Sequence, residues 1–235
     1  MNSNRRKPIN MIKKMSLVLC VFLCACSKPD TSWFPLSEGY WWQYSAERTI
    51  RGETHTQKLI QANLPSVKTE GAVLFLRKRA DGHIDYYEKT EDGVFHVNLE
   101  DGVKDQLLPA SIEVGSKWQR KSKILFLEMT GAFEATYEDR IKEEIVINYH
   151  VESLDDVVDV AAGHFVKCLR IVGKGSLYGG GGTLEEFMDI DDINIETVDW
   201  YAPGVGLIKR TRKEYTHPLK FENHYSEELE SIKVG

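Results

Sequence analysis

Cysteine is scarce in the body of this 235-residue chain. Cys20, Cys24 and Cys26 lie within seven positions near the N-terminus, and only Cys168 lies further along. A disulfide-based scaffold distributes an even number of cysteines through its domain, so this spacing excludes that class. Cys168 lies in the apolar segment 165–172, where we expect a small buried hydrophobe. The sequence therefore predicts neither a disulfide nor a catalytic thiol.

The chain also lacks an apolar run of the about 20 residues that a membrane-spanning helix needs. Its longest run, 15–25, has 11 residues and is interrupted only by Ser16. Five basic residues and no acidic residue precede this run. A basic start followed by a short apolar stretch is typical of a secretory signal. Met1 and Met11 both remain candidates for the start of translation, since Met11 opens a more typical signal.

The apolar run ends in Leu23-Cys24-Ala25-Cys26, which resembles the lipobox cut by the lipoprotein signal peptidase. This pattern predicts a signal peptide over 1–25 and cleavage before Cys26. The alternatives are an ordinary cleaved signal and a short N-terminal anchor. The resemblance to bacterial lipoproteins implies a diacylglyceryl thioether and an N-acyl chain, such as palmitate, on Cys26. Two or more acyl chains hold a protein stably on a membrane, whereas a single chain binds only marginally.

The residue after the lipidated cysteine indicates which membrane receives the protein. In bacterial lipoproteins Asp at this position usually signals retention in the inner membrane, and here the position is Ser27. The resemblance therefore implies the periplasmic face of the outer membrane in a host with two membranes. The first expected partner is this membrane, contacted through the acyl chains on Cys26.

A basic excess is absent as well. The 30 Lys and Arg residues fall to 25 when the five in 1–25 are removed, all 36 Asp and Glu remain, and the net charge becomes −11. Binding to nucleic-acid phosphates needs a clustered basic surface, so we expect no nucleic-acid partner. The basic runs 117–123 and 209–213 lie inside strand-like segments, and we interpret them as solvated strand faces.

What the chain does contain is a series of strand-like segments separated by glycine turns. Asp81-Gly82 and Asp92-Gly93 are strong hairpin signals, and Arg51-Gly52 and Asp101-Gly102 mark further turns. Pro203-Gly204-Val205-Gly206 predicts another sharp turn. The predicted strands are 40–50, 54–61, 73–79, 83–90, 94–99, 117–127, 141–151, 165–172, 197–201, 207–215 and 219–229.

Apolar and polar residues alternate most clearly over 141–151. Ile141, Ile145, Ile147, Tyr149 and Val151 share one face, which predicts one buried and one solvated side, as in an antiparallel sheet. The apolar residues of 133–145 also fit helical spacing, but we favour a strand. No long amphipathic helix and no linker stands out elsewhere. The prediction is a short lipidated tether, 26–33, followed by a single mainly β domain with little helix, 34–235.

Two copies of the pattern G-x-x-W-Q lie 76 residues apart, at Gly39–Gln43 and Gly115–Gln119. We expect them to mark two related halves of the sheet. Trp41, Trp42, Trp118 and Trp200 lie at predicted strand ends, where aromatic rings can close a cavity, face a partner or pack into the core.

A family resemblance rests on four segments spread over the mature chain: Phe34–Tyr44, Gly115–Trp118, Ala162–Leu169 and Trp200–Lys209. Together they resemble the uncharacterised TapB-type group of secreted bacterial β-proteins. This resemblance implies a curved antiparallel sheet or half-barrel in the cell envelope. It assigns no catalytic residues.

No segment carries a motif for catalysis or metal binding. The run 173–176 lacks the spacing of a phosphate-binding loop, and no G-x-S-x-G or H-E-x-x-H pattern occurs. The acidic run 189–194 resembles a calcium loop, but Ile193 occupies a ligand position and Trp200 stands where a bidentate Glu belongs. We interpret this run and the acidic residues of 155–159 as solvated. The prediction is a protein without enzymatic activity, without a cofactor and without a metal site.

Three classes of function remain. The first is a noncatalytic binding module that holds an apolar ligand or a lipid against the concave side of the sheet. The alternative is a structural or assembly partner in a cell-envelope complex, using an edge strand or an aromatic end as the contact. An enzyme is the third class and has no motif in its favour. Ligand-binding residues cannot be assigned from the sequence.

Overall fold

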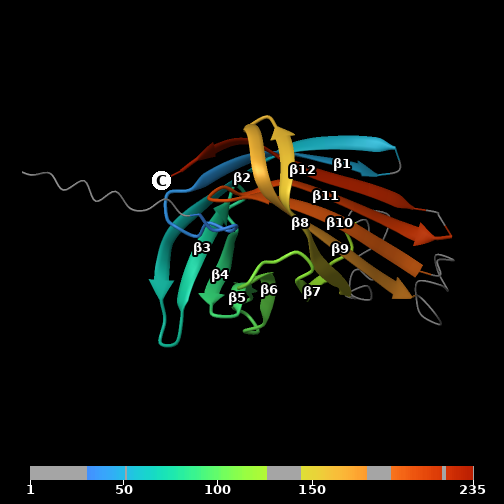
Figure 1. Cartoon of the computed structure of the whole chain (residues 1–235). Coiled ribbons are helices and arrows are strands. Elements are labelled where there is room, and N and C mark those ends of the chain that lie inside the picture. Colours follow the sequence, from blue (N-terminus) through green and yellow to red (C-terminus); the bar gives the residue numbers. More distant parts are fainter. Residues whose placement is uncertain (1–30, 51, 126–143, 179–191, 219–220, 235) are drawn as a thin grey trace, which may run out of the picture.

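The computed structural model describes residues 31–50, 52–125, 144–178, 192–218 and 221–234. They contain a single antiparallel sheet of twelve strands in the order β6-β5-β4-β3-β2-β1-β12-β11-β10-β9-β8-β7 (Figure 1). The prediction of a mainly β fold with a curved antiparallel sheet is confirmed. The predicted signal peptide and Cys26 lie outside the described residues and remain predictions.

The sheet consists of two six-stranded halves. The first half contains β1 (Trp41–Ile50), β2 (Glu53–Lys68), β3 (Val73–Arg79), β4 (Ile84–Thr90), β5 (Gly93–Val97) and β6 (Lys104–Pro109). The second contains β7 (Lys117–Ser122), β8 (Ile145–Val160), β9 (Gly163–Tyr178), β10 (Asp192–Ala202), β11 (Gly206–His217) and β12 (Glu222–Lys233). Within each half, neighbouring strands follow one another along the chain. The pairing of β1 with β12 joins the halves.

The two G-x-x-W-Q motifs stand at the beginnings of these halves, as the sequence predicts. Gly39 and Gly115 have φ of 88° and 91°, a conformation that glycine adopts without steric cost. The chain then enters β1 and β7, and the tryptophan of each motif turns inward. Trp42 is 1% exposed and Trp118 is 8% exposed. Each motif therefore combines a turn with an aromatic anchor at the start of a half.

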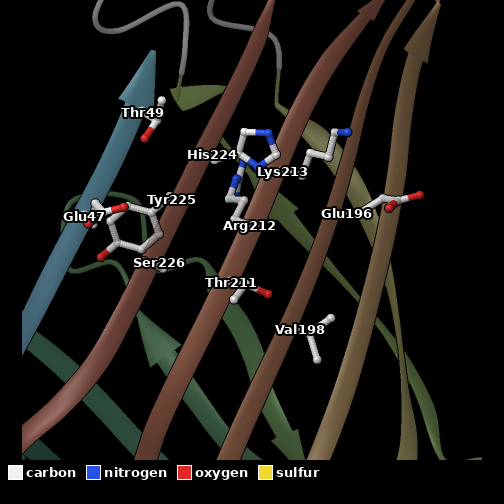
Figure 2. A pocket seen from close by; sticks show the side chains of 10 residues that line it. All are labelled: Glu47, Thr49, Glu196, Val198, Thr211, Arg212, Lys213, His224, Tyr225 and Ser226. Atoms are coloured by element: carbon white, nitrogen blue, oxygen red, sulfur yellow. The ribbon is translucent and has the colours of Figure 1, made fainter. Parts of the chain in front are cut away.

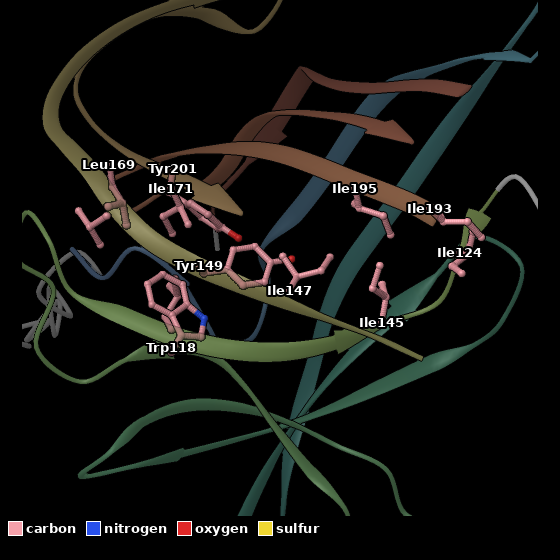
Figure 3. Close-up of a cluster of buried hydrophobic side chains, with 12 residues drawn as sticks. Trp118, Ile124, Ile145, Ile147, Tyr149, Leu169, Ile171, Ile193, Ile195 and Tyr201 are labelled. Carbon is pink, nitrogen blue, oxygen red and sulfur yellow. The ribbon is translucent and has the colours of Figure 1, made fainter. Parts of the chain in front are cut away.

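The inner side of the second half carries the main apolar core (Figure 3). The predicted alternation is confirmed over the described part of its range, because Ile145, Ile147, Tyr149 and Val151 are all buried. Trp118 stacks on Tyr149 with ring centroids 5.6 Å apart. The cluster also contains Leu108, Ile124, Leu169, Ile171, Ile193, Ile195 and Tyr201. Since Leu108 belongs to β6 and Ile195 to β10, side chains from both halves meet across the concave side.

Glycine at position 173 permits this packing. A Cβ atom there would come within 2.6 Å of the Tyr149 ring and 2.7 Å of the Thr197 methyl group, closer than real Cβ contacts. The neighbouring Gly175 faces a similar limit, because its Cβ would lie 2.7 Å from the backbone oxygen of Val146. The run 173–176 is thus a segment of β9 whose glycines allow close strand packing.

The far end of the β8–β9 hairpin crosses the sheet and covers a second core. Register shifts between Val151 and Val158 bend β8, and the hairpin end reaches across β12 (Figure 1). The Ala162 N–H donates to the Leu229 carbonyl at 3.0 Å. Val158 and Cys168 pack there in a cluster with Tyr40, Trp42, Tyr44, Ala202, Ile208 and Leu229. Cys168 is a free thiol that is 0% exposed, as predicted, and its burial raises its pKa to about 11.

The barrel closes through side chains at its seam. Within the described chain, the edge strands β6 and β7 each pair with a single strand. Arg120 of β7 donates from Nε to Asp105 Oδ2 of β6 at 2.9 Å and so connects the two edges. The sequence predicts no strand at β6, and several predicted boundaries differ from the structure. β2 continues to Lys68, β7 ends at Ser122, β8 continues nine residues past Val151 and β9 extends to Tyr178. β10 begins at Asp192, and β12 runs from Glu222 to Lys233.

Candidate functional site

The concave side of the sheet contains an ionic network besides the apolar core. Arg210 of β11 donates to both carboxylate oxygens of Asp199 on β10, at 2.7 and 2.6 Å. On its other side Arg210 lies 4.0 Å from Glu227 of β12, which accepts a hydrogen bond from the Tyr225 hydroxyl. Asp199 and Glu227 are each 4% exposed. Burial opposes the charge of Arg210, but Asp199 outweighs this effect and the pKa of the guanidinium rises.

The interpretation of the basic runs as solvated faces is therefore wrong for their arginines. In β11, Arg210 and Arg212 point inward, while Lys209 and Lys213 point outward. Arg212 forms an ion pair with Glu214, which is 0% exposed, at 2.7 Å. Arg120 of the first run likewise faces inward toward Asp105. Asp199 reaches Arg210 from the neighbouring strand β10, and Asp105 reaches Arg120 from β6 across the seam. Glu214 lies two residues after Arg212 on the same strand.

Arg77 fills the concave side of the first half. Its guanidinium carbon lies 4.3 Å from the Trp42 ring centroid, 4.4 Å from that of Phe34 and 5.4 Å from that of Tyr87. Its Nη2 donates to the Pro35 carbonyl at 2.9 Å. This cage fixes the segment that precedes β1 against the sheet. Together with the ionic network and the apolar core, it occupies the concave side with the chain's own side chains.

A hollow lies on the opposite, outer side of the sheet, where β1, β12, β11 and β10 run side by side (Figure 2). We call it the outer hollow. It has a volume of about 280 Å³ and is lined by Glu47, Thr49, Glu196, Val198, Thr211, Arg212, Lys213, His224, Tyr225 and Ser226. Side chains alternate along a strand, so Thr211 and Lys213 of β11 and His224 and Ser226 of β12 point to the outer side. Arg212 and Tyr225 lie between them, and their side chains bond to Glu214 and Glu227 on the inner side. The lining is dominated by hydroxyl, carboxylate, ammonium and imidazole groups.

Ion pairs border the outer hollow. Lys213 lies 3.2 Å from Glu222, and the His224 ring also contacts that carboxylate. The hydrogen bond from His224, and to a smaller extent that from Lys213, holds the pKa of Glu222 below its usual value. Glu222 is therefore ionised at neutral pH and suits electrostatic binding rather than proton donation. Lys174 lies 3.6 Å from Glu196 on the opposite border.

A second hollow of about 360 Å³ adjoins the first and shares Glu196 with it. Its lining comes from β8 to β11 and comprises Asn148, Lys174, Gly175, Ser176, Asn194, Ile195, Glu196 and Tyr215. Amide, hydroxyl and charged groups again prevail. The two hollows thus form one polar, solvent-open surface across six neighbouring strands.

The tryptophans expected at strand ends differ in exposure. Trp118 is buried in the first core and Trp42 in the second, against which Trp200 also packs. Trp41 and Trp200 are partly exposed, and Trp200 Nε1 donates to Asp156 at 3.1 Å. Of the predicted acidic clusters, Asp156 and Asp159 lie in β8, while only part of 189–194 is described, at the start of β10. The predicted turn at 203–206 is confirmed between β10 and β11.

Sequence reasoning did not find the outer hollow. Its lining combines β1 near one end of the chain with β10, β11 and β12 near the other, and each strand contributes ordinary polar residues. The available signal is the alternation of Thr211 and Lys213 with the inward arginines of β11. Among the described residues, no group of three His, Cys, Asp or Glu side chains is arranged to hold a metal ion. Those residues also include no helix that is long and apolar enough to cross a membrane.

No family model and no curated protein matches the chain. Two solved structures share part of its shape. One is a protein from Bacteroides fragilis described as exported and as having a YmcC-like fold; it is 12% identical, with 86% of this chain and 99% of that chain covered at a TM-score of 0.44. The other is described as a lipoprotein from Parabacteroides distasonis; it is 11% identical, with 88% and 100% covered at a TM-score of 0.42.

Proposed function

We propose that the protein is a noncatalytic binding module, anchored through Cys26 to the periplasmic face of the outer membrane, which holds a polar ligand in the outer hollow. The observation that carries this proposal is the lining of the hollow. Thr49, Thr211 and Ser226 offer hydroxyl groups, and Glu47 and Glu196 offer carboxylates within one depression. Because Lys213 and His224 stand in the same lining as these carboxylates, the site favours a ligand that carries both hydrogen-bond donors and acceptors.

The concave side supports an apolar ligand less well. Arg77, Arg120 and Arg210 occupy it together with their acidic or aromatic partners. An apolar molecule placed there would have to separate buried ion pairs, which leaves uncompensated charges at a cost of about 3–5 kcal/mol for each broken pair. The outer hollow imposes no such cost.

An isotope-labelled sample of the mature protein tests this proposal by NMR. Ethanolamine, glycerol and tri-alanine serve as polar probes, and 1-anilinonaphthalene-8-sulfonate serves as the apolar probe. We expect at least one polar probe to shift amide signals of β1, β10, β11 and β12 around the hollow. Replacing Thr211 and Ser226 by Ala removes two hydroxyl groups from the lining and should weaken these shifts.

Gln119→Ala is the matched control, because Gln119 is an exposed polar residue of β7 outside the hollow. It should leave the shifts unchanged. Two results would contradict the proposal. One is that the amide shifts persist after Thr211→Ala and Ser226→Ala; the other is saturable binding of one apolar probe per protein on the concave side.

A second candidate is the role of assembly partner in an envelope complex. The open edges of β6 and β7 favour it, because an edge can accept a further strand. However, Lys104, Lys117, Lys121 and Pro109 lie on these edges, and lysine and proline are the residues that discourage strand addition. Crosslinking in cells from position 106 of β6 would recover a single envelope protein if this role holds.

A further inference from the structure

The outer side of the first half differs in chemistry from the outer side of the second half. In β2–β5 the strand register aligns Leu64, Leu76, Tyr86 and Val97 in one row across four strands. Leu74 and Phe95 flank this row on the same side, both paired with Glu88 of the intervening strand. We call these six apolar side chains the apolar face. On the second half the outward residues are mainly polar: Thr211, Lys213, His224, Ser226 and Glu196 line the outer hollow together with Val198.

The direction of these side chains follows from their neighbours. Arg77, Tyr87 and His96 alternate with them along β3, β4 and β5 and contact one another or Trp42 on the concave side. The apolar face therefore points away from the barrel. Neither apolar core includes any of its members. Five of the six side chains are partly exposed, and Val67 at the margin is 48% exposed.

The margins of this face carry cations and an aromatic ring. Lys104 continues the row beyond Val97 and forms an ion pair with Glu88 at 2.5 Å. A parallel row contains Trp41, Lys78 and Ile84. Lysines with long apolar stems and amphipathic aromatic rings around an apolar centre are typical of surfaces that lie in a membrane interface. The net charge of −11 after cleavage would otherwise keep the domain away from an anionic membrane.

The start of the domain lies where the two halves of the sheet meet. The Ser32 carbonyl accepts a hydrogen bond from the Gly204 N–H of the β10–β11 turn at 2.9 Å, beside Val205, whose carbonyl accepts from Trp42 Nε1. Phe34 packs on Tyr87 with ring centroids 5.1 Å apart, on the concave side of β4. From Cys26 to Thr31 there are five residue steps, which span at most about 17 Å. A sheet with its side chains is about 10 Å thick, so this reach is sufficient to pass from one side to the other. Acyl chains on Cys26 would thus enter a bilayer near the start of β1, at the row of Trp41, Lys78 and Ile84 that borders the apolar face.

We propose that the apolar face rests on the surface of the phospholipid bilayer to which Cys26 tethers the chain. The inference rests on the lipid anchor of the proposed function. It adds to that function the orientation of the domain relative to the bilayer. Tyr86 and the leucines are immersed among the headgroups, and Lys78 and Lys104 meet their phosphates. The outer hollow, on the other half of the sheet, remains open to the periplasm.

Fluorescent labels on the lipidated full-length protein test this orientation in vesicles of phosphatidylethanolamine and phosphatidylglycerol. Leu76→Cys places a nitrobenzoxadiazole label in the centre of the apolar face. Thr211→Cys places the same label on the outer side of β11 and is the control. Cys168 is buried and does not react. Flotation of the vesicles reports the anchor separately from the position of the label.

We expect a nitroxide lipid to quench the label at position 76 at least about threefold more than at 211, because interfacial surfaces sink roughly 5–10 Å into the headgroup boundary. Tyr86→Cys in the same row provides a second position, and circular dichroism confirms that both variants fold. Equal quenching at 76 and 211 in protein that floats overturns the orientation alone. Protein that does not float overturns the anchor and with it the orientation. A blue shift at 76 without vesicles that grows with protein concentration assigns the face to a second copy and also overturns the inference.

Discussion

The ion pair between Arg210 and Asp199 provides the sharpest test of the concave side. Replacing Arg210 by Met keeps most of the side-chain volume but leaves Asp199 and Glu227, each 4% exposed, without their cation. Breaking a buried pair in this way costs about 3–5 kcal/mol. A domain of this size is stable by about 5–15 kcal/mol, so the variant should lose a large fraction of its free energy of unfolding.

Urea denaturation followed by Trp fluorescence measures this loss. With a slope of about 2–3 kcal/mol per M, the midpoint should fall by roughly 1–2 M. Lys209→Met is the matched control, because Lys209 neighbours Arg210 in β11 and pairs with Glu228 at 2.7 Å on the outer side. Both partners are partly exposed, so this change should cost less than about 1 kcal/mol.

A double-mutant cycle isolates the pair itself. Asp199→Asn together with Arg210→Met should cost less than the sum of the single changes, with a coupling energy of at least about 2 kcal/mol, since the two groups are in contact. If Arg210→Met costs no more than Lys209→Met, or if the coupling is near zero, then the network does not stabilise the concave side as argued.

Three further predictions concern other parts of the chain. Cys26→Ala should abolish labelling by a fatty-acid analogue and stop maturation by the lipoprotein peptidase; continued labelling would refute the lipoprotein assignment. Burial raises the pKa of Glu227 above its ordinary value of 4.5, so the folded state keeps the carboxyl proton to higher pH than the unfolded chain. The free energy of unfolding should therefore fall as the pH rises from below 4.5 through the raised pKa. Glu227→Gln should remove this decline, and parallel pH profiles from urea midpoints would contradict the reasoning. Gly173→Ala should destabilise the protein by about 1–3 kcal/mol, because the added methyl group collides with Tyr149 and Thr197; an unchanged midpoint would show that these side chains move aside freely.

Most of the sheet could be predicted from local signals. Asp81-Gly82 and Asp92-Gly93 lie in tight turns, and the strands beside them were placed within one or two residues. β6 cannot be recognised in the sequence because its pairing with β5 skips Leu107 and the strand ends at Pro109. As a result, apolar and polar residues do not alternate regularly along it. The second part of β8 cannot be recognised for the same reason. Three register shifts and several aspartates interrupt the alternation of apolar and polar residues there.

The pairs of Arg120 and Arg210 could not be predicted, because their acidic partners come from other strands. Arg210 looks like part of an exposed basic run until β10 places Asp199 beside it and β12 places Glu227 beside it. One local signal was available. Ile208, Arg210 and Arg212 are spaced two residues apart and so lie on the same face of the strand. If Ile208 points inward, the two arginines must point inward as well.

The pairing of β1 with β12 has a consequence for how the chain acquires its structure. The first strand to emerge and the last are neighbours in the middle of the sheet, with Trp41 opposite Lys233. All other neighbouring strands are consecutive along the chain, so each half can assemble from local hairpins. The pairing in the middle of the sheet can form only after the final dozen residues of β12 are available. Truncation before β12 would leave a six-stranded meander, β1 to β6, and a five-stranded meander, β7 to β11, each with an uncovered concave surface. Joining the termini and opening the chain between β6 and β7 would instead give a protein in which every paired strand follows its neighbour, and such a permutant should fold faster.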